Sequence, residues 1–282
     1  MNIDFYEESN LYWGIGAHGR KKKLTAPQTV NVYENGPKIS DDTVATWENN
    51  TRTMQYWLKH LQDIFHYPKI DFIWFTADSS QFDIDDITEV FGSANQVWIS
   101  DTGCYAFNQM ILQNFLPVEK IIIKPANFQN AKIPGKILMQ NFDFLDIDNG
   151  LEGPTSITLD ELLLINSKKS YIGFFRISAK QINKFIKLWQ RGSNSRMEYL
   201  GIDCTNVNED DNEVIMEGIS HQVIPADQRR RFKPAECGIP EVIEGGIDVS
   251  RRDGVKATIL FRGRQFPAVE MVVWFDHCVM ES

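Results

Sequence analysis

Residues 14–19 have the spacing of a phosphate-binding turn. They form a GxGxxG pattern, and Glu34 follows at about the distance at which an acidic residue would contact a ribose. Such a turn must open directly into a helix whose N-terminal amide groups hold the pyrophosphate. Here the basic residues 20–23 lead into Pro27 without forming an apolar helix face. The pattern therefore favours a glycine-rich hairpin turn over a nucleotide site.

Two histidine-containing groups have side chains suited to metal binding or nucleophilic catalysis. His60 and His66 share one expected helix with Asp63, but the two histidines would point about 120° apart, which favours a solvated helix face over a metal site. His277 and Cys278 are adjacent. In a strand they would point to opposite faces, so they would not form a nucleophile–base pair.

The remaining motifs of catalysis are missing from the sequence. It contains no GxSxG, HExxH or Walker sequence. We therefore expect no catalytic residues, no metal ligands and no cofactor. Enzymatic activity is therefore the third alternative for the function of this chain, after the two protein-binding roles described below.

Charge and composition narrow the classes of partner. The chain has 29 Lys and Arg against 38 Asp and Glu, a net charge of −9. An acidic protein is poorly suited to coat nucleic acid or an anionic membrane. The basic clusters 20–23, 229–231 and 251–252 do not alternate with aromatic residues, which favours solvated surface and ion pairing with the acidic excess over a nucleic-acid platform. We expect no nucleic-acid partner.

Hydropathy and cysteine usage bear on the compartment. Mean hydropathy is −0.30, and no apolar run approaches the roughly 20 residues that a membrane helix needs. The four cysteines, Cys104, Cys204, Cys237 and Cys278, form no CxxC pair. Reduced thiols in a cytoplasmic or nuclear protein are the expectation.

Short apolar segments recur through the middle of the chain. As the expected strands of the fold, they would carry the functional residues. Their centres are Ile73, Trp98, Ile122, Leu145, Ile172 and Leu200. Successive centres are 25, 24, 23, 27 and 28 residues apart. One strand and one return per step of this length is typical of leucine-rich-repeat-like units. We predict an α/β fold with a curved parallel sheet and helical returns; an ordinary doubly wound sheet is the alternative.

Helix signals fall between these segments. Thr158 and Ser178 begin capping boxes, and the second precedes a stripe formed by Ile182, Phe185, Ile186 and Trp189. Residues 83–91 predict a shorter helix. Residues 125–135 show only a weak helical pattern. In residues 52–66 one face would be shared by Met54, Trp57, Leu58, Leu61, Ile64 and Phe65. That helix is expected to cap the open end of the repeat.

The flanks differ from the repeat, so we divide the chain into three segments. Residues 1–50 read as strands and turns, and residues 51–205 as the repeat-like α/β core. Residues 206–282 read as an antiparallel β portion of the same domain. It would begin with an acidic loop over 206–213 and place a charged turn at 251–254.

A motif between residues 159 and 202 combines a leucine-rich segment, a tryptophan-containing helix and a Gly-Ser-Asn turn. Its matching residues are Leu159, Asp160, Leu162, Leu163, Asn166, Ser167, Asn183, Phe185, Lys187, Trp189, Gly192, Ser193, Asn194, Glu198, Tyr199 and Leu200. This motif resembles the type 2 F-box-associated domain, a large family best known from nematodes. Similar blocks occur near 57–66 and 245–259, so the resemblance spans about 50–275.

The residue types of this motif predict structural roles. Phe185 and Trp189 would lie on a buried stripe, and residues 192–194 would end the helix and turn the chain. Asn166 and Asn183 are expected to bond to backbone groups at turns.

The resemblance implies a protein-interaction function. Family members usually begin with an F-box that docks onto the adaptor of a cullin-type ubiquitin ligase, while the associated domain presents the substrate. Residues 1–50 lack the expected helical module, so we expect no F-box and no direct docking onto the adaptor. The expected function is recognition of a target protein for ubiquitination. The alternative is an F-box-less relative that binds or competes for targets without ligase coupling.

The target-binding face is expected on the concave side of the sheet, the usual binding surface of solenoid proteins. Outward-pointing residues at the strands are the candidates for target binding. These are Trp74, Ser100, Lys124 and Asp146.

Overall fold

The computed structural model divides the chain into two compact units, Met1–Asn130 and Ala131–Ser282. It describes residues 2–6, 10–15, 24, 29–33, 43–48, 52–66, 70–77, 79–148, 150, 155–205, 207, 210–233, 241–263 and 267–280. The three segments expected from the sequence, 1–50, 51–205 and 206–282, are divided by their expected secondary structure and not by compactness. Their boundaries stay predictions.

The first unit is built on a mixed sheet. Its strands are β1 (Asn2–Tyr6), β2 (Asn10–Ile15), β3 (Thr29–Tyr33), β4 (Thr43–Glu48), β5 (Ile70–Phe75), β6 (Ala94–Ile99) and β7 (Lys120–Ile123). They lie in the order β7-β6-β5-β2-β1-β3-β4. The pairs β5–β6 and β6–β7 are parallel and consecutive, as the repeat predicts.

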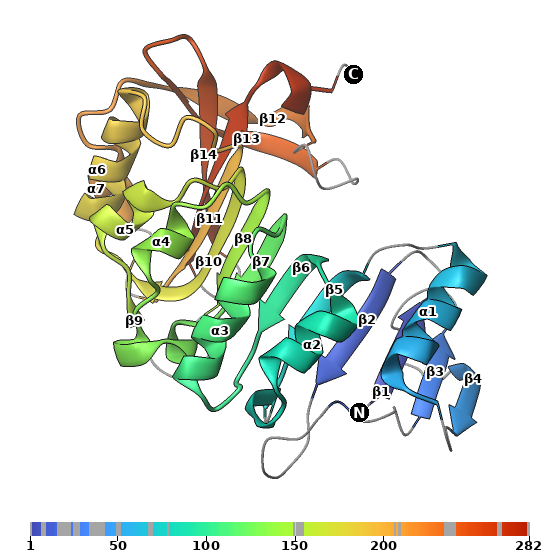
Figure 1. Ribbon diagram of the computed structural model, residues 1–282. Helices are drawn as coiled ribbons and strands as arrows, with labels where there is room; N and C mark the ends of the chain where they lie inside the picture. The colour runs from blue at the N-terminus through green and yellow to red at the C-terminus, as the bar shows by residue number, and fades with distance from the viewer. Residues whose placement is uncertain are drawn as a thin grey trace. The chain divides into compact units, whose positions relative to one another are not determined.

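Helices occupy the returns between these strands. They are α1 (Met54–Phe65), η1 (Ser79–Gln81), α2 (Ile84–Phe91), α3 (Tyr105–Phe115) and η2 (Pro125–Asn127), with η3 (Gln129–Ala131) spanning the division. Asp83 caps α2 by accepting a hydrogen bond from the Asp85 amide, as its position before the apolar stripe predicts. In Figure 1, α2 lies against one face of β5 and β6.

Strand register builds the core of the first unit. Ile73, Val97 and Ile121 are paired across β5, β6 and β7, and all three are buried. Phe75, Ile99 and Ile123 form a second buried row two residues later. The apolar side chains of neighbouring strands therefore lie side by side on one face of the sheet. Repeated units share one core in this way.

The second unit contains the other three repeat strands and an antiparallel portion. Its strands are β8 (Phe144–Asp148), β9 (Thr155–Ser156), β10 (Lys169–Arg176), β11 (Tyr199–Cys204), β12 (His221–Phe232), β13 (Glu241–Ser250), β14 (Lys256–Gly263) and β15 (Pro267–Trp274). β8, β10 and β11 are parallel neighbours. From β11 onward the pairs β11–β15, β15–β14, β14–β13 and β13–β12 are antiparallel, as predicted.

The second unit's helices are α4 (Gly135–Leu138), α5 (Leu159–Leu164), α6 (Ala179–Gln190), α7 (Asp211–Met216) and η4 (Asp276–Cys278). The capping boxes of Thr158 and Ser178 form as predicted and begin α5 and α6. Figure 1 shows α5 and α6 on one side of the parallel strands. Leu145, Ser170 and Leu200 form one buried row across β8, β10 and β11, and Ile147, Ile172 and Ile202 the next.

The fold is thus mixed α/β, with parallel and antiparallel pairs, and leucine-rich-repeat-like curvature stays a prediction. Among the described residues, no helix has the length and apolar character needed to cross a bilayer.

Several sequence expectations are wrong in detail. The sheet does not end at β5, because β2 pairs with that strand; α1 therefore does not close an open edge. Ile64 is exposed because it lies at the margin of the α1 stripe. Part of the expected acidic loop is instead α7, whose first turn holds Asp211 and Glu213, favourable at a helix N-terminus, while Ile215 is buried.

Two expectations about charged and reactive residues also change. Arg251 lies in a turn between β13 and β14 and forms an ion pair, with Asp253, as predicted, but its side chain is buried and not solvated. His277 and Cys278 belong to the 3₁₀ turn η4, so the alternation expected of a strand does not separate them. Cluster 20–23, Cys237 and the glycine pattern beyond Ile15 lie outside the described residues.

Candidate functional site

In the first unit, the predicted binding residues lie at the C-terminal ends of the parallel strands. Trp74 is half-buried on β5, and its ring stacks on Trp98 with centroids 4.5 Å apart and planes 11° apart. Ser100 and Lys124 follow β6 and β7 directly. Trp74 and Trp98 are cross-strand partners, so this stack covers the sheet face opposite the buried rows.

An asparagine that the sequence reasoning missed connects Ser100 and Lys124. The Asn127 side-chain amide donates to the Ser100 carbonyl, and its oxygen accepts from the Lys124 amide at 3.1 Å. Asn108 in turn donates to the Asn127 carbonyl at 2.7 Å. Both asparagines are buried. They fix the strand ends, and no local signal distinguishes them from the other asparagines of these returns, such as Asn114 and Asn130.

Asp146, the fourth predicted residue, lies in the second unit within a group of acids and tyrosines. On the face opposite the buried rows, Asp146 pairs in register with Tyr171, and Tyr171 with Gly201. The Tyr171 hydroxyl donates to the Asp203 carboxylate. Burial, with a smaller contribution from the nearby charge of Asp148, raises the pKa of Asp146 to about 7. Its carboxyl group therefore titrates near neutral pH.

The motif residues of α6 and the following turn have structural roles, as predicted. Phe185 and Trp189 are buried. The Asn183 amide donates to the carbonyls of Ile215 and Glu217 at 2.8 and 2.9 Å, joining α6 to the end of α7. Asn166 differs from the expectation, because its side-chain amide donates to the Asn141 side chain and not to backbone.

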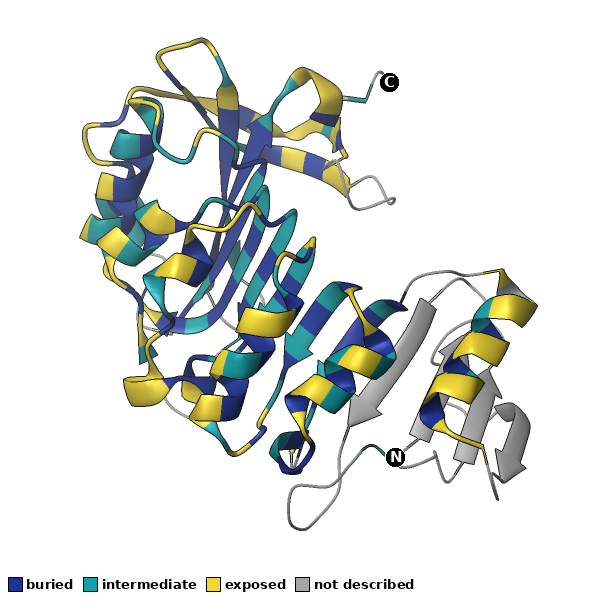
Figure 2. Cartoon of the chain, in the orientation of Figure 1, coloured by how far each residue is buried: buried dark blue, intermediate teal, exposed yellow. Residues whose placement is uncertain are grey.

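A groove lies beside β12 in the antiparallel portion, with a volume of about 880 Å³. β12 is the last strand in the sheet order, and most of its residues are exposed (Figure 2). The groove is lined by Gln222, Ile224, Gln228, Arg229, Arg230, Arg231, Val242, Asp248, Lys256, Trp274, Val279 and Met280. We call this surface the β12 groove.

A hydrogen-bonded network builds the floor of the β12 groove. Arg230 donates two bonds from one nitrogen to the Asp248 carboxylate, at 2.9 and 3.1 Å, and its guanidinium lies 4.7 Å from the centroid of the Trp274 ring. Thr258 joins the three residues by accepting from Arg230 at 2.9 Å and from the Trp274 ring nitrogen at 2.7 Å. The charge of Arg230 is thus neutralised by a partner, and its role is to hold the floor.

Two other cations of the groove differ from Arg230. Arg231 and Lys256 are exposed, and neither forms an ion pair with a described residue. Arg229 is paired with Glu244 at 2.9 Å, but both side chains are largely exposed. Val242 and Val279, each 50% exposed, add apolar surface. Within the described part of the chain, the groove therefore offers positive charge without an acidic partner, beside apolar contacts, in a chain whose net charge is −9.

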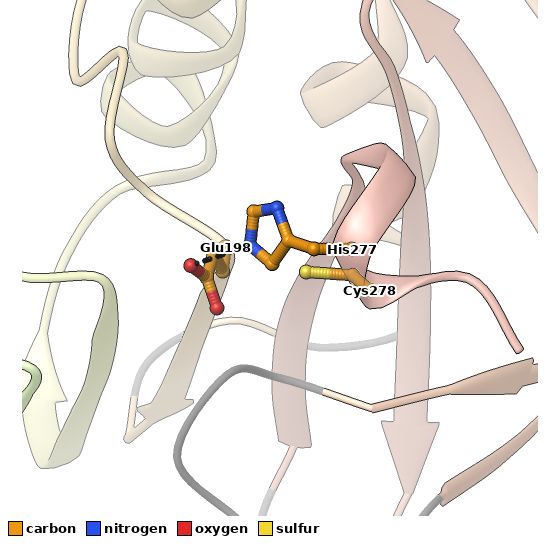
Figure 3. A group of neighbouring side chains, drawn as sticks. All are labelled: Glu198, His277 and Cys278. Carbon is orange, nitrogen blue, oxygen red and sulfur yellow. Dashed lines mark hydrogen bonds and ion pairs between the residues drawn. The ribbon is translucent and has the colours of Figure 1, made fainter.

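A second group of reactive side chains lies where η4 meets the residue before β11. Figure 3 shows His277 and Cys278 of η4 pointing toward Glu198. His277 Nε2 is 3.0 Å from Glu198 Oε1, and one ligand atom from each of the three residues lies within 4.8 Å of the others. By contrast, His60, Asp63 and His66 form no such group in the part of the chain that the structure describes.

Comparison with protein families identifies the segment that contains α4, α5, α6 and three of the parallel strands. Residues 133–202 match a family model described as F-box associated. This segment is an F-box-associated domain of type 2. The matched residues lie within the range over which the motif predicted the resemblance. Comparisons with curated proteins and with solved structures found no match.

The F-box-associated domain accounts for part of the second unit. The matched region includes Asn183, Trp189 and Glu198 but ends at Ile202, before the strands that form the β12 groove. The match over this segment indicates a protein-interaction role related to F-box proteins. The groove itself was not foreseen from the sequence, because the cluster 229–231 gives no sign that one arginine is neutralised and another is not.

Proposed function

We propose that this chain binds a target protein whose acidic, extended segment lies in the β12 groove. The observation that carries the proposal is the presence of two exposed cations, Arg231 and Lys256, without an acidic partner among the described residues. Complementary charge selects partners and accelerates their encounter. An acidic segment would supply the missing negative charge, and its apolar side chains would contact Val242 and Val279.

The backbone beside the groove supports an extended partner. The Phe232 end of β12 already bridges Val279 in an antiparallel manner. The Lys233 amide donates to the Cys278 carbonyl at 2.9 Å, and the Met280 amide to the Arg231 carbonyl at 3.3 Å. At one end, the outer edge of β12 thus already bonds to an extended segment of the chain through its backbone. Toward His221 no described strand covers that edge, so a partner segment could add there by β-strand addition.

We further propose that the bound protein is a target for ubiquitination, the role carried by F-box-associated domains in ligase subunits. The alternative remains a protein that binds or competes for the same targets without ligase coupling. In both roles the chain contributes binding and no catalytic step. The cytoplasm or nucleus is the proposed compartment.

Affinity purification with charge-reversed variants tests both parts. The variant carrying Arg231→Glu and Lys256→Glu should recover the target at least tenfold less efficiently, because both unpaired cations become repulsive to an acidic segment. Arg252→Glu is the matched control: it reverses an exposed arginine outside the groove and should leave recovery unchanged. Equal recovery by all variants would rule out the groove as the target site.

The same purification separates the two biological roles. Recovery of a cullin and its adaptor with the parent chain would support ligase coupling. Recovery of the target without them would support the competitor role. Binding at Trp74, Ser100, Lys124 or Asp146 stays a separate prediction, and it would be unaffected by the two groove substitutions.

A further inference from the structure

We propose that Glu198, His277 and Cys278 bind a zinc ion. The inference is independent of target binding at the β12 groove. A carboxylate, an imidazole and a thiolate are all zinc ligands, and a site with three protein ligands leaves a fourth position for water. The three side chains point toward one another from two separate segments of the second unit (Figure 3).

The three ligand atoms lie close enough together to reach one small tetrahedral ion after small side-chain movements. Zinc bonds of about 2.0–2.3 Å place neighbouring ligand atoms about 3.3–3.6 Å apart. His277 Nε2 and Glu198 Oε1 are 3.0 Å apart, and all three ligand atoms lie within 4.8 Å of one another. A zinc ion therefore requires the imidazole–carboxylate pair to open slightly by side-chain rotation.

The backbone on both sides of the group is fixed. The Glu198 amide donates to the Lys168 carbonyl at 2.7 Å, and its carbonyl accepts from the Val273 amide at 2.8 Å. On the other segment, the Cys278 amide donates to the Phe275 carbonyl at 2.8 Å. The Phe275 ring also stacks on the His277 ring at 5.6 Å. The backbone that carries the ligands is thus ordered before an ion arrives, which lowers the ordering cost of binding.

Burial gives the site one open side. Glu198 and Cys278 are buried, whereas 55% of the His277 side chain is exposed. An ion could enter past His277, and the water at its fourth position would face solvent. Thiolate and imidazole ligands favour zinc over magnesium or calcium, which prefer oxygen ligands throughout.

Binding must displace one proton. Burial and the nearby Glu198 carboxylate raise the pKa of the Cys278 thiol to about 12, so the thiol is protonated at neutral pH. When zinc binds, the S–H bond breaks, a Zn–S bond forms, and the proton passes to solvent. Because the thiol must lose this proton, zinc affinity should fall as pH is lowered.

A bound zinc ion would join η4 to the start of β11. The residues directly after η4, Val279 and Met280, bridge β12 and line its groove. The ion would therefore stabilise the C-terminal segment that forms one side of the groove.

Metal titration of the full chain tests the proposal. After treatment with a chelator, the parent chain should bind one Zn²⁺ in competition with a chromophoric chelator. With Co²⁺ as a spectroscopic probe, it should show a thiolate-to-cobalt charge-transfer band. Cys278→Ser should abolish that band, and His277→Ala should weaken zinc binding at least tenfold. Cys104→Ser, which removes a free cysteine of the other unit, should change neither.

Each opposite result overturns the proposal. Zinc bound less than stoichiometrically by the parent, unchanged zinc affinity in His277→Ala, or a cobalt band that persists in Cys278→Ser would show that these residues hold no metal. His277 is largely exposed, so His277→Ala should fold and decides the matter if Cys278→Ser does not.

Discussion

The guanidinium of Arg251 lies over the ring of Trp189, 5.5 Å from its centroid. Trp189 is fully buried on α6, within the F-box-associated domain, whereas Arg251 belongs to the turn between β13 and β14 beyond it. Arg251 also pairs with Asp253 at 2.7 Å. This contact joins the family-matched segment to the antiparallel strands that carry the β12 groove.

Loss of the arginine should weaken that connection. Arg251→Ala removes a buried cation–π contact and its packing, for an expected destabilisation of about 1–3 kcal/mol. Asp253 is exposed and can be hydrated when its partner is removed. Chemical denaturation measures the change, with Arg252→Ala as the exposed neighbour. Equal stability of both variants would contradict a structural role for Arg251.

Truncation of the tryptophan should have a larger effect. Trp189→Ala would leave a cavity in the core of the second unit and cost about 3–5 kcal/mol. Lys184→Ala, at an exposed position of the same helix, is the control and should change stability by less than about 0.5 kcal/mol. Thermal melting compares the three proteins, and a parent-like melting temperature for Trp189→Ala would place that ring outside the core.

Asn194, which is distant in sequence from α5, caps the C-terminal end of that helix. Its side-chain amide donates to the Leu162 and Ile165 carbonyls at 3.1 and 2.6 Å, and its φ of 49° lies in the left-handed region. Asn194→Gly removes the two hydrogen bonds without backbone strain and should cost about 1–3 kcal/mol. Asn194→Ala should cost about 1 kcal/mol more, because alanine is strained at this φ.

Denaturation of both Asn194 variants separates the two effects. If Asn194→Gly were as stable as the parent, the hydrogen bonds would contribute nothing. If Asn194→Ala matched Asn194→Gly, the backbone strain would be absent.

The raised pKa of Asp146 predicts a pH dependence of stability. The folded chain binds this proton up to about pH 7, whereas the unfolded chain releases it near pH 4. The native state therefore holds more protons between these values, and the contribution of Asp146 to stability falls as pH rises from about 4 to about 7.

Asp146→Asn should remove this dependence. The variant should be more stable than the parent by about 1–3 kcal/mol above pH 7, with the difference shrinking toward pH 4. Unfolding free energies measured across this range test the prediction, with Asp101→Asn as a control at an exposed carboxylate. A constant difference between variant and parent would contradict the raised pKa.

Much of the fold could be predicted because local signals agree with packing. The capping residues Thr158 and Ser178 begin helices as expected, since a side-chain oxygen beside an apolar stripe satisfies the first amide groups. The apolar centres, among them Ile73 and Ile172, lie in parallel strands because each repeat buries its face on the next. Their period in the sequence was enough to identify the strands.

The candidate sites could not be predicted, because they depend on contacts between distant residues. Nothing local indicates that Glu198 meets His277, 79 residues later. Likewise, Arg230 and Arg231 are adjacent in sequence, but strand alternation gives only Arg230 the acidic partner Asp248. The strand pairing that creates these differences is visible only in three dimensions.

Site-specific photo-crosslinking tests the central claim, target binding at the β12 groove, most directly. A photo-reactive residue placed at Val242, in the groove, should crosslink the purified target within an acidic segment, as identified by mass spectrometry. A photo-reactive residue at Lys124, on the other unit, should give no adduct with that acidic segment. Crosslinking from Lys124 without crosslinking from Val242 would contradict the account and place target binding at the ends of the parallel strands.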